Sequence, residues 1–322
     1  MKDKKINIGG QAVIEGVMMR SPEYVSTVIR RADGSLETDN KKFIPLSKRF
    51  RLLNIPVIRG AVGLFEMMKI GIGTLNWSAD RAIEDEKKAK GEKIEKEKRS
   101  FLASLSEALG TSAVLIIALG IFMYIPYKLT DIFERFNDNQ FLFNLLAGII
   151  RTVFLVLYMY SISFMKDVKR LFEYHGAEHK AIAAFEKGLE MKVENVKPQS
   201  RFHPRCGTSF ILIAAIITIF IFSIFDSFFY LFYTYPNVFA RIGVHLLFLP
   251  VVVGISFELL KLSEKYIHVP SVRILIKPGL WLQHITTGEP DESQMEVAIE
   301  SVKLSTEYLN ITEKEEQNVS VI

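Results

Sequence analysis

Four apolar segments, each long enough to cross a lipid bilayer, constrain the fold of this chain more than any other feature. They are residues 108–127, 139–165, 206–225 and 242–260. The first and third carry no charged side chain, the second carries only Arg151 and the fourth only Glu258. A helix needs about 20 apolar residues to cross the roughly 30 Å hydrocarbon core of a bilayer. The sequence therefore predicts a mainly α-helical integral membrane protein with about four transmembrane helices, held in the lipid bilayer.

Lysine and arginine are unevenly distributed among the segments that connect these helices. Residues 166–205 carry nine of them, whereas residues 128–140 carry two and residues 234–241 carry one. Positively charged connections stay on the cytoplasmic side, and in residues 1–20 no basic start is followed by the apolar run of a cleavable signal peptide. We therefore expect a protein of the cell membrane with both termini and the 166–206 loop in the cytoplasm. The net charge of +4 is small and lies in these connections, which suits anionic lipid and not nucleic acid.

The pattern along the whole chain predicts five parts. These are a cytoplasmic β-rich part (1–54), an interfacial or re-entrant amphipathic helix (55–80), a charged linker (81–100), the membrane domain (101–265) and a cytoplasmic tail (266–322). The β-rich part contains a hairpin pattern that turns at Asp33–Gly34, and it is the expected surface for protein partners. Polar residues recur at helical spacing in 56–80, which indicates an apolar helix with one polar face. In the tail, residues 268–283 predict a short strand and turn, and residues 291–304 an amphipathic helix before a frayed end.

Two histidines and a glutamate form the strongest functional pattern. His175, Glu178 and His179 have the order H-x-x-E-H, in a helical run expected to continue from the second apolar segment and to stop at Gly188. Side chains three and four residues apart share one face of a helix, so the two imidazoles can hold one ion. This order is the inverted form of the zinc-protease motif, in which the glutamate moves a proton for a water molecule. A hydrogen-bonded His–Glu cluster would satisfy the same buried groups without a metal.

A second cluster precedes the third apolar segment and contains His203 and the only cysteine of the chain, Cys206. Pro204 suits the first turn of a helix, which places His203 at the cap and Cys206 in the first turn. A helix N-terminus lowers the pKa of a thiol, so we expect Cys206 to favour the thiolate. Imidazole and thiolate donors together suit zinc. The alternative is a small buried cysteine beside a capping histidine.

Other ionisable residues need partners inside or beside the membrane. Glu258, near the cytoplasmic end of the fourth segment, is a weaker candidate for a metal ligand or for a residue that orients one. Its alternative is a pair with a nearby lysine. The glycine-rich stretch that contains Glu15 predicts a bent strand or loop packed on the membrane domain. The alternative interpretation makes Glu15 a second weaker candidate for a partner of the metal site. Arg151 and Asp226 are expected to pair for structural reasons.

Three motifs occur in order along the chain and carry a resemblance to a known family. They are Gly9-Gly-Gln-Ala-Val-Ile-Glu-Gly-Val-Met-Met-Arg20, Tyr174-His-Gly-Ala-Glu-His179 and His203-Pro-Arg-Cys-Gly-Thr208. The chain resembles the YqhQ-like bacterial membrane proteins, a family described as predicted metal-dependent enzymes. The resemblance extends to Thr287-Gly-Glu-Pro-Asp291. It implies a multi-pass membrane protein with a metal site formed by His175, Glu178, His179, His203 and Cys206.

These observations leave three functional hypotheses. The first is a cytoplasm-facing zinc-dependent hydrolase, in which the two motif histidines and one ligand from the second cluster hold the ion and Glu178 is the general base. The location alone suggests a peptide or lipid-linked substrate. The second is a membrane scaffold or assembly factor, in which all four His and Cys side chains close a structural zinc site. The third is a channel or transporter lined by the few ionisable residues of the spans. Three protein ligands with water favour catalysis, and four favour a structural site.

Overall fold

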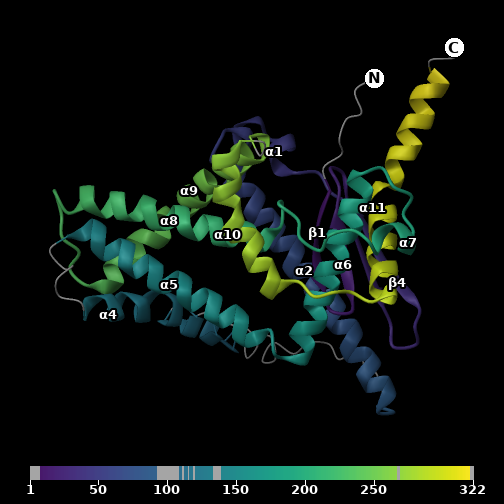
Figure 1. Ribbon diagram of the computed structural model, residues 1–322, viewed down its shortest axis with the longest axis horizontal. Coiled ribbons are helices and arrows are strands. Elements are labelled where there is room, and N and C mark those ends of the chain that lie inside the picture. Colours follow the sequence, from purple (N-terminus) through teal and green to yellow (C-terminus); the bar gives the residue numbers. More distant parts are fainter. Residues whose placement is uncertain are drawn as a thin grey trace.

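The membrane part is a bundle of apolar helices (Figure 1). The computed structural model describes residues 8–92, 109–132, 139–266 and 269–319, apart from residues 111, 115 and 119. In this described part, the helices long and apolar enough to cross a membrane are Ser112–Asp131, Phe141–Ile162, Gly207–Phe229 and Val238–Leu262. They contain η2 (Gly120–Tyr124) with α4 (Ile125–Asp131), α5 (Gln140–Ile162), α8 (Gly207–Phe229) and most of α9 (Val238–Lys265). The pairs α4–α5, α5–α8 and α8–α9 are in contact. The predicted multi-pass helical membrane protein is confirmed.

A four-stranded antiparallel sheet stands at one end of this bundle (Figure 1). Its strands are β1 (Gly9–Val13), β2 (Gly16–Arg20), β3 (Tyr24–Arg30) and β4 (Leu36–Lys42), in that order. Gly34 has a φ of 86° between β3 and β4, a conformation that glycine adopts without strain. The hairpin expected around Asp33–Gly34 is therefore confirmed. The glycine-rich stretch before it forms a second hairpin, β1–β2.

Helices cover both faces of the sheet. They are α2 (Ile58–Ala89) on one face, and α6 (Lys166–Glu186) with α11 (Glu292–Val319) on the other. Side chains alternate between the faces along a strand. Along β2, Val17 and Met19 therefore join the core with α6 and α11, while Met18 between them faces α2. The short helices α1 (Leu46–Arg49), η1 (Arg51–Asn54) and α7 (Val193–Val196) complete this layered part.

Two helices, α2 and α10 (Pro270–Thr286), run at a steep angle to the apolar helices and connect them to the layered part (Figure 1). Near its start, α2 packs on α9, where Gly60 lies against Phe257. α10 packs on α8, where Gly279 lies against Ser209. Both helices expose large apolar side chains, and neither is among the candidate spans. The segment expected at 55–80 is thus a helix with exposed apolar side chains, and its place at the membrane interface stays a prediction.

Two helices are longer than the sequence pattern indicated. α2 continues past residue 80 to Ala89, so the charged segment begins as helix, and residues 93–100 of that segment lie outside the described residues. The tail helix, expected at 291–304, continues to Val319 as α11. In both cases residues rich in Lys and Glu extend the helix, since these side chains are good helix formers.

Two local expectations were wrong. Residues 270–286 form helix α10 instead of a strand and turn, because Pro270 suits a helix start and one face of the helix packs on α8. The second span and the motif helix are separate, since α5 ends at Ile162 and α6 begins at Lys166. Met165 between them has extended backbone, with a ψ of 133°. This break lets α6 leave the bundle and reach the sheet.

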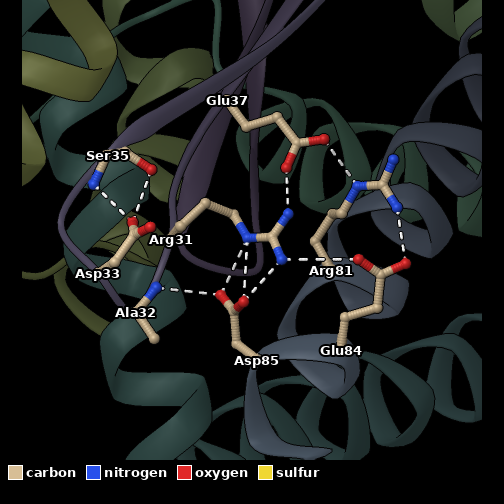
Figure 2. Close-up of polar contacts among 8 residues, drawn as sticks. All are labelled: Arg31, Ala32, Asp33, Ser35, Glu37, Arg81, Glu84 and Asp85. Atoms are coloured by element: carbon tan, nitrogen blue, oxygen red, sulfur yellow. Dashed lines mark hydrogen bonds and ion pairs between the residues drawn. The ribbon is translucent and has the colours of Figure 1, made fainter. Parts of the chain in front are cut away.

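An ion-pair network joins the β3–β4 hairpin to α2, as Figure 2 shows. Arg31 donates to Asp85 through Nη2, at 2.6 Å, and through Nε, and it also donates to Glu37. From α2, Arg81 donates to Glu37 and Glu84 at 2.8 Å. The hydrogen bonds from Arg31 lower the pKa of Asp85 to about 2. The network therefore ties the outer hairpin of the sheet to the second half of α2.

Candidate metal centre

The H-x-x-E-H motif occupies the buried face of α6. Glu178 is 4% exposed and His179 is 1% exposed, and the side chain of His175 is 13% exposed. The ring centres of His175 and His179 are 4.4 Å apart. α6 ends at Glu186, and Gly188 follows with a φ of 66°. The predicted stop and the predicted buried position of the motif are confirmed.

Cys206 joins the two histidines in a group of three potential metal donors. It lies directly before α8, as the N-cap of that helix. Its Sγ atom is 3.2 Å from Nε2 of His175, and one ligand atom from each of the three residues lies within 4.8 Å of the other two. Donors around a tetrahedral zinc ion, with bonds of about 2.0–2.3 Å, are separated by roughly 3.5 Å. Small side-chain shifts would therefore bring these three donors to one ion.

Backbone carbonyl groups set the tautomers of both histidines. Nδ1 of His175 donates to the carbonyl of Thr286 at 2.8 Å, and Nδ1 of His179 donates to the carbonyl of Arg201 at 2.5 Å. Because a carbonyl can only accept, each Nδ1 carries the proton and each Nε2 presents a lone pair. Burial also lowers the pKa of His179 to about 2, which keeps its ring neutral. Ligating histidines are held in this way in metal sites, so the residues present fit a metal ion.

Glu178 lies beside this donor group. Its Oε2 atom is 3.9 Å from Nε2 of His175. Its other side faces β1, where the N–H of Gly10 donates to the carboxylate. A Cβ added at Gly10 would lie 3.0 Å from the Cγ of Glu178. Burial raises the pKa of Glu178 to about 7, against a smaller opposing effect of His175. A carboxyl group with a pKa near neutrality can both accept and release a proton.

Cys206 differs from expectation in two respects. α8 begins at Gly207, because a turn closed by the Cys206 N–H and the His203 carbonyl precedes it. Burial also raises the pKa of the Cys206 thiol, and hydrogen bonds from the start of α8 offset only part of this effect. The predicted thiolate is therefore wrong for the metal-free protein. A metal ion that binds a thiol displaces its proton, so the raised pKa makes binding depend on pH.

His203 lies near the group but outside it. Its ring centre is 5.8 Å from that of His179, its Nε2 is 3.4 Å from Oε2 of Glu186, and its Nδ1 accepts from the N–H of Arg205. Gln283 of α10 holds the His203 backbone from both sides. Its Oε1 accepts from the His203 N–H at 2.8 Å, and its Nε2 donates to the His203 carbonyl at 2.7 Å. The structure thus brings together three of the four side chains expected as ligands.

The two weaker candidates lie away from the donor group. Glu15, at the tip of the β1–β2 hairpin, forms an ion pair with Arg170 and accepts from the hydroxyl of Tyr174 at 3.3 Å. Glu15 therefore contacts the motif helix α6 at residues that precede the donor group. Glu258 pairs with Arg59 of α2, with Nε and Oε1 2.6 Å apart.

The expected pair between Arg151 and Asp226 is not formed. Asp226 is fully buried and accepts from Arg241, whose Nη2 lies 2.6 Å from Oδ2. The further donors to this carboxylate are Asn144, Tyr235 and His245. Arg151 donates instead to the carbonyl of Phe122 at 3.0 Å. Asp226 is near the end of α8 and Arg241 in the first turn of α9, so chain reversal brings these two together.

The residues that orient the donors carry no signal that sequence reasoning recognised. Thr286 and Arg201 act through their carbonyl groups, and Gln283 acts across 80 residues of sequence. The motif stretch Gly288-Glu-Pro290 was the one sequence feature that pointed to this part of the site. An added Cβ at Gly176 of α6 would collide with the carbonyl of Gly288, so the two backbones meet at van der Waals contact. Glycine is needed there because another backbone approaches closely.

Comparison with known proteins gives the chain a family. Residues 55–307 match the family described as "Protein of unknown function (DUF1385)". This chain belongs to that family. A relative from Bacillus subtilis (strain 168), "Uncharacterized protein YqhQ", is 36% identical over 318 residues, which cover 96% of this chain and 94% of the relative. No solved structure matches the chain.

The DUF1385 match includes the donor residues on α6 and before α8, whereas the four strands precede it. The alignment with the Bacillus protein covers nearly the whole chain. The resemblance to YqhQ-like bacterial membrane proteins is therefore confirmed.

Proposed function

We propose that this DUF1385 protein is a zinc-dependent hydrolase that acts at the cytoplasmic face of the cell membrane. The observation that most directly supports this proposal is the convergence of His175, His179 and Cys206 beside a buried Glu178. Three protein donors leave a coordination position for a water molecule or a substrate. His203, the fourth side chain expected as a ligand, points its Nε2 toward Glu186 instead.

Each residue of the site has a distinct role in this proposal. His175, His179 and Cys206 hold the ion. A zinc ion in such a site acidifies a water molecule and polarises a carbonyl or phosphoryl group. Glu178, buried beside the three donors, takes a proton from the attacking water and returns it to the leaving group. Because Cys206 directly precedes a membrane span, a peptide or lipid-linked substrate at the bilayer surface is favoured.

A structural zinc clamp is the second candidate, and the burial of the donor side chains favours it. Cys206 is 5% exposed and His179 is 1% exposed, so a substrate would need an opening beside them. The ion would then join α6 to the start of α8, and a rotation of His203 would supply a fourth ligand. In that case the protein would be a membrane scaffold whose β-rich part binds protein partners.

Metal analysis and complementation separate the two candidates. Protein purified in detergent without added metal should contain about one zinc ion per chain, and His179→Ala should lose it. His284→Ala, on the exposed side of α10, is the matched control and should keep it. A hydrolase retains zinc in His203→Ala, and its Glu178→Gln variant stays folded and zinc-loaded but does not rescue a deletion strain. Zinc loss in His203→Ala together with full rescue by Glu178→Gln would favour the clamp, and wild-type protein without metal would exclude both.

A further inference from the structure

A charged side chain lies halfway along a membrane helix beside a small cavity. Arg151 is the twelfth residue of the 23-residue helix α5, about 16 Å from either end. The cavity has a volume of about 20 Å³, and its lining includes Asn144, Gly148, Arg151, Thr218, Phe222 and His245. A space of that size holds one water molecule or one small ion.

The guanidinium of Arg151 is held at η2 through its Nε atom. Its Nε donates to the carbonyl of Phe122 at 3.0 Å, in the π-helical turn η2. Pro126, four residues later, has no N–H to donate to that carbonyl. Within the described residues, the two terminal amino groups of Arg151 donate to no protein acceptor. Those groups are therefore available to the cavity that Arg151 lines.

The buried charges around this cavity do not balance. Asp226 and Arg241 neutralise each other at 2.6 Å, and His245 completes the bonding of the carboxylate at 3.0 Å. Among the described residues, no carboxylate lies within 4.0 Å of Arg151. One positive charge is thus left over in the middle of the bundle. An ionisable side chain at this depth needs a partner, because the hydrocarbon offers it no solvation.

We propose that the cavity binds a small monovalent anion, of the chloride class, against the guanidinium of Arg151. A single negative charge cancels the excess charge of the cluster. A volume of about 20 Å³ is enough for one monatomic ion. Asn144 and His245 line the same cavity and are held by their bonds to Asp226, so they shape the site from α5 and α9. The anion stabilises the contact of α4, α5, α8 and α9 and is independent of the proposed hydrolase site.

Thermal unfolding in defined salt tests this site. The full-length protein is placed in nanodiscs of zwitterionic lipid, and sodium chloride is exchanged for sodium gluconate at constant ionic strength. A ligand that binds only the folded state raises Tm with its concentration, so Tm should rise with chloride. Arg151→Gln should abolish the response. Arg81→Gln, an arginine of the layered part, is the matched control and should keep it.

A binding measurement covers the case in which Arg151→Gln fails to fold. Radiolabelled chloride should bind to the wild type at about one ion per chain, and Arg151→Lys, which keeps the charge, should bind it more weakly. A Tm that is the same in chloride and gluconate, or an equal chloride response in folded Arg151→Gln, overturns the proposal. Stabilisation by anionic lipid with no effect of chloride also overturns it, because a lipid phosphate would then be the partner of Arg151.

Discussion

The carbonyl oxygen of Thr286 accepts the Nδ1 proton of His175 at 2.8 Å, although 111 residues separate the two in sequence. The last residue of α10 thereby orients a donor side chain of α6. The loop that follows is held on α6 by the Gly288 N–H, which donates to the carbonyl of Phe172 at 2.7 Å. Its close approach at Gly176 leaves no space for a side chain. The candidate metal centre therefore depends on a backbone contact as well as on its donors.

Gly176→Ala is expected to weaken metal binding without altering a donor. The added methyl group would press on the carbonyl of Gly288 and move the loop, so that Thr286 no longer orients His175. Loss of such a supporting bond costs roughly 10- to 100-fold in metal affinity. Gly73→Ala on α2, where nothing lies within 4 Å of an added Cβ, is the control. Competition with a chelator measures both affinities, and equal values would contradict the role of Thr286.

In metal-free protein, Glu178 makes stability depend on pH. Burial raises its pKa to about 7 in the folded protein, from 4.5 in the unfolded chain. Between these values the folded protein holds a proton that the unfolded chain has released, so the free energy of unfolding falls as pH rises from about 4.5 to about 7. The expected loss is about 3 kcal/mol. Denaturant unfolding of Glu178→Gln should show a smaller loss over this range, and identical pH profiles would refute the assignment.

Arg31→Met is expected to loosen the β3–β4 hairpin from α2 (Figure 2). The change removes the common donor of Asp85 and Glu37, which should lower the free energy of unfolding by about 1–3 kcal/mol. The Lys41→Met control removes an ion pair with Asp39 in which the lysine is 72% exposed, and it should cost about 0.5 kcal/mol or less. Hydrogen exchange at Ala32, whose N–H donates to Asp85 at 3.0 Å, reports the release locally. Equal protection in the two variants would mean that the network does not hold the hairpin.

Cysteine labelling tests the membrane orientation. Lys192 lies in the basic connection between α6 and α8 with its side chain 59% exposed, and Tyr233 is 70% exposed between α8 and α9. If the basic side is cytoplasmic, an impermeant thiol reagent applied to intact cells should label Tyr233→Cys but not Lys192→Cys. In permeabilised cells, the reagent should label both variants. The unaltered protein is the control, because Cys206 is 5% exposed. Labelling of Lys192→Cys alone would place the candidate metal centre outside the cytoplasm.

Features that depend on neighbours in sequence could be predicted without the structure. Four apolar segments were sufficient to indicate the bundle, because the length of a membrane helix is set by the thickness of the bilayer. The spacing of His175, Glu178 and His179 placed them on one face of α6, since helix geometry alone determines that. The same local reasoning failed at residues 270–286. Packing on α8 favours a helix there, and tertiary contacts outweigh weak local preferences.

The sequence by itself determined the membrane class, the β-hairpin and the residue types able to bind a metal. Only the tertiary structure decided which of those residues meet. Cys206 lies with the two histidines, whereas His203, whose backbone bonds to Gln283 of α10, directs its Nε2 to Glu186. Glu258 is paired with Arg59 because α2 crosses α9. Such choices depend on distances of a few ångströms between residues far apart in the chain, and those distances arise only when the helices pack.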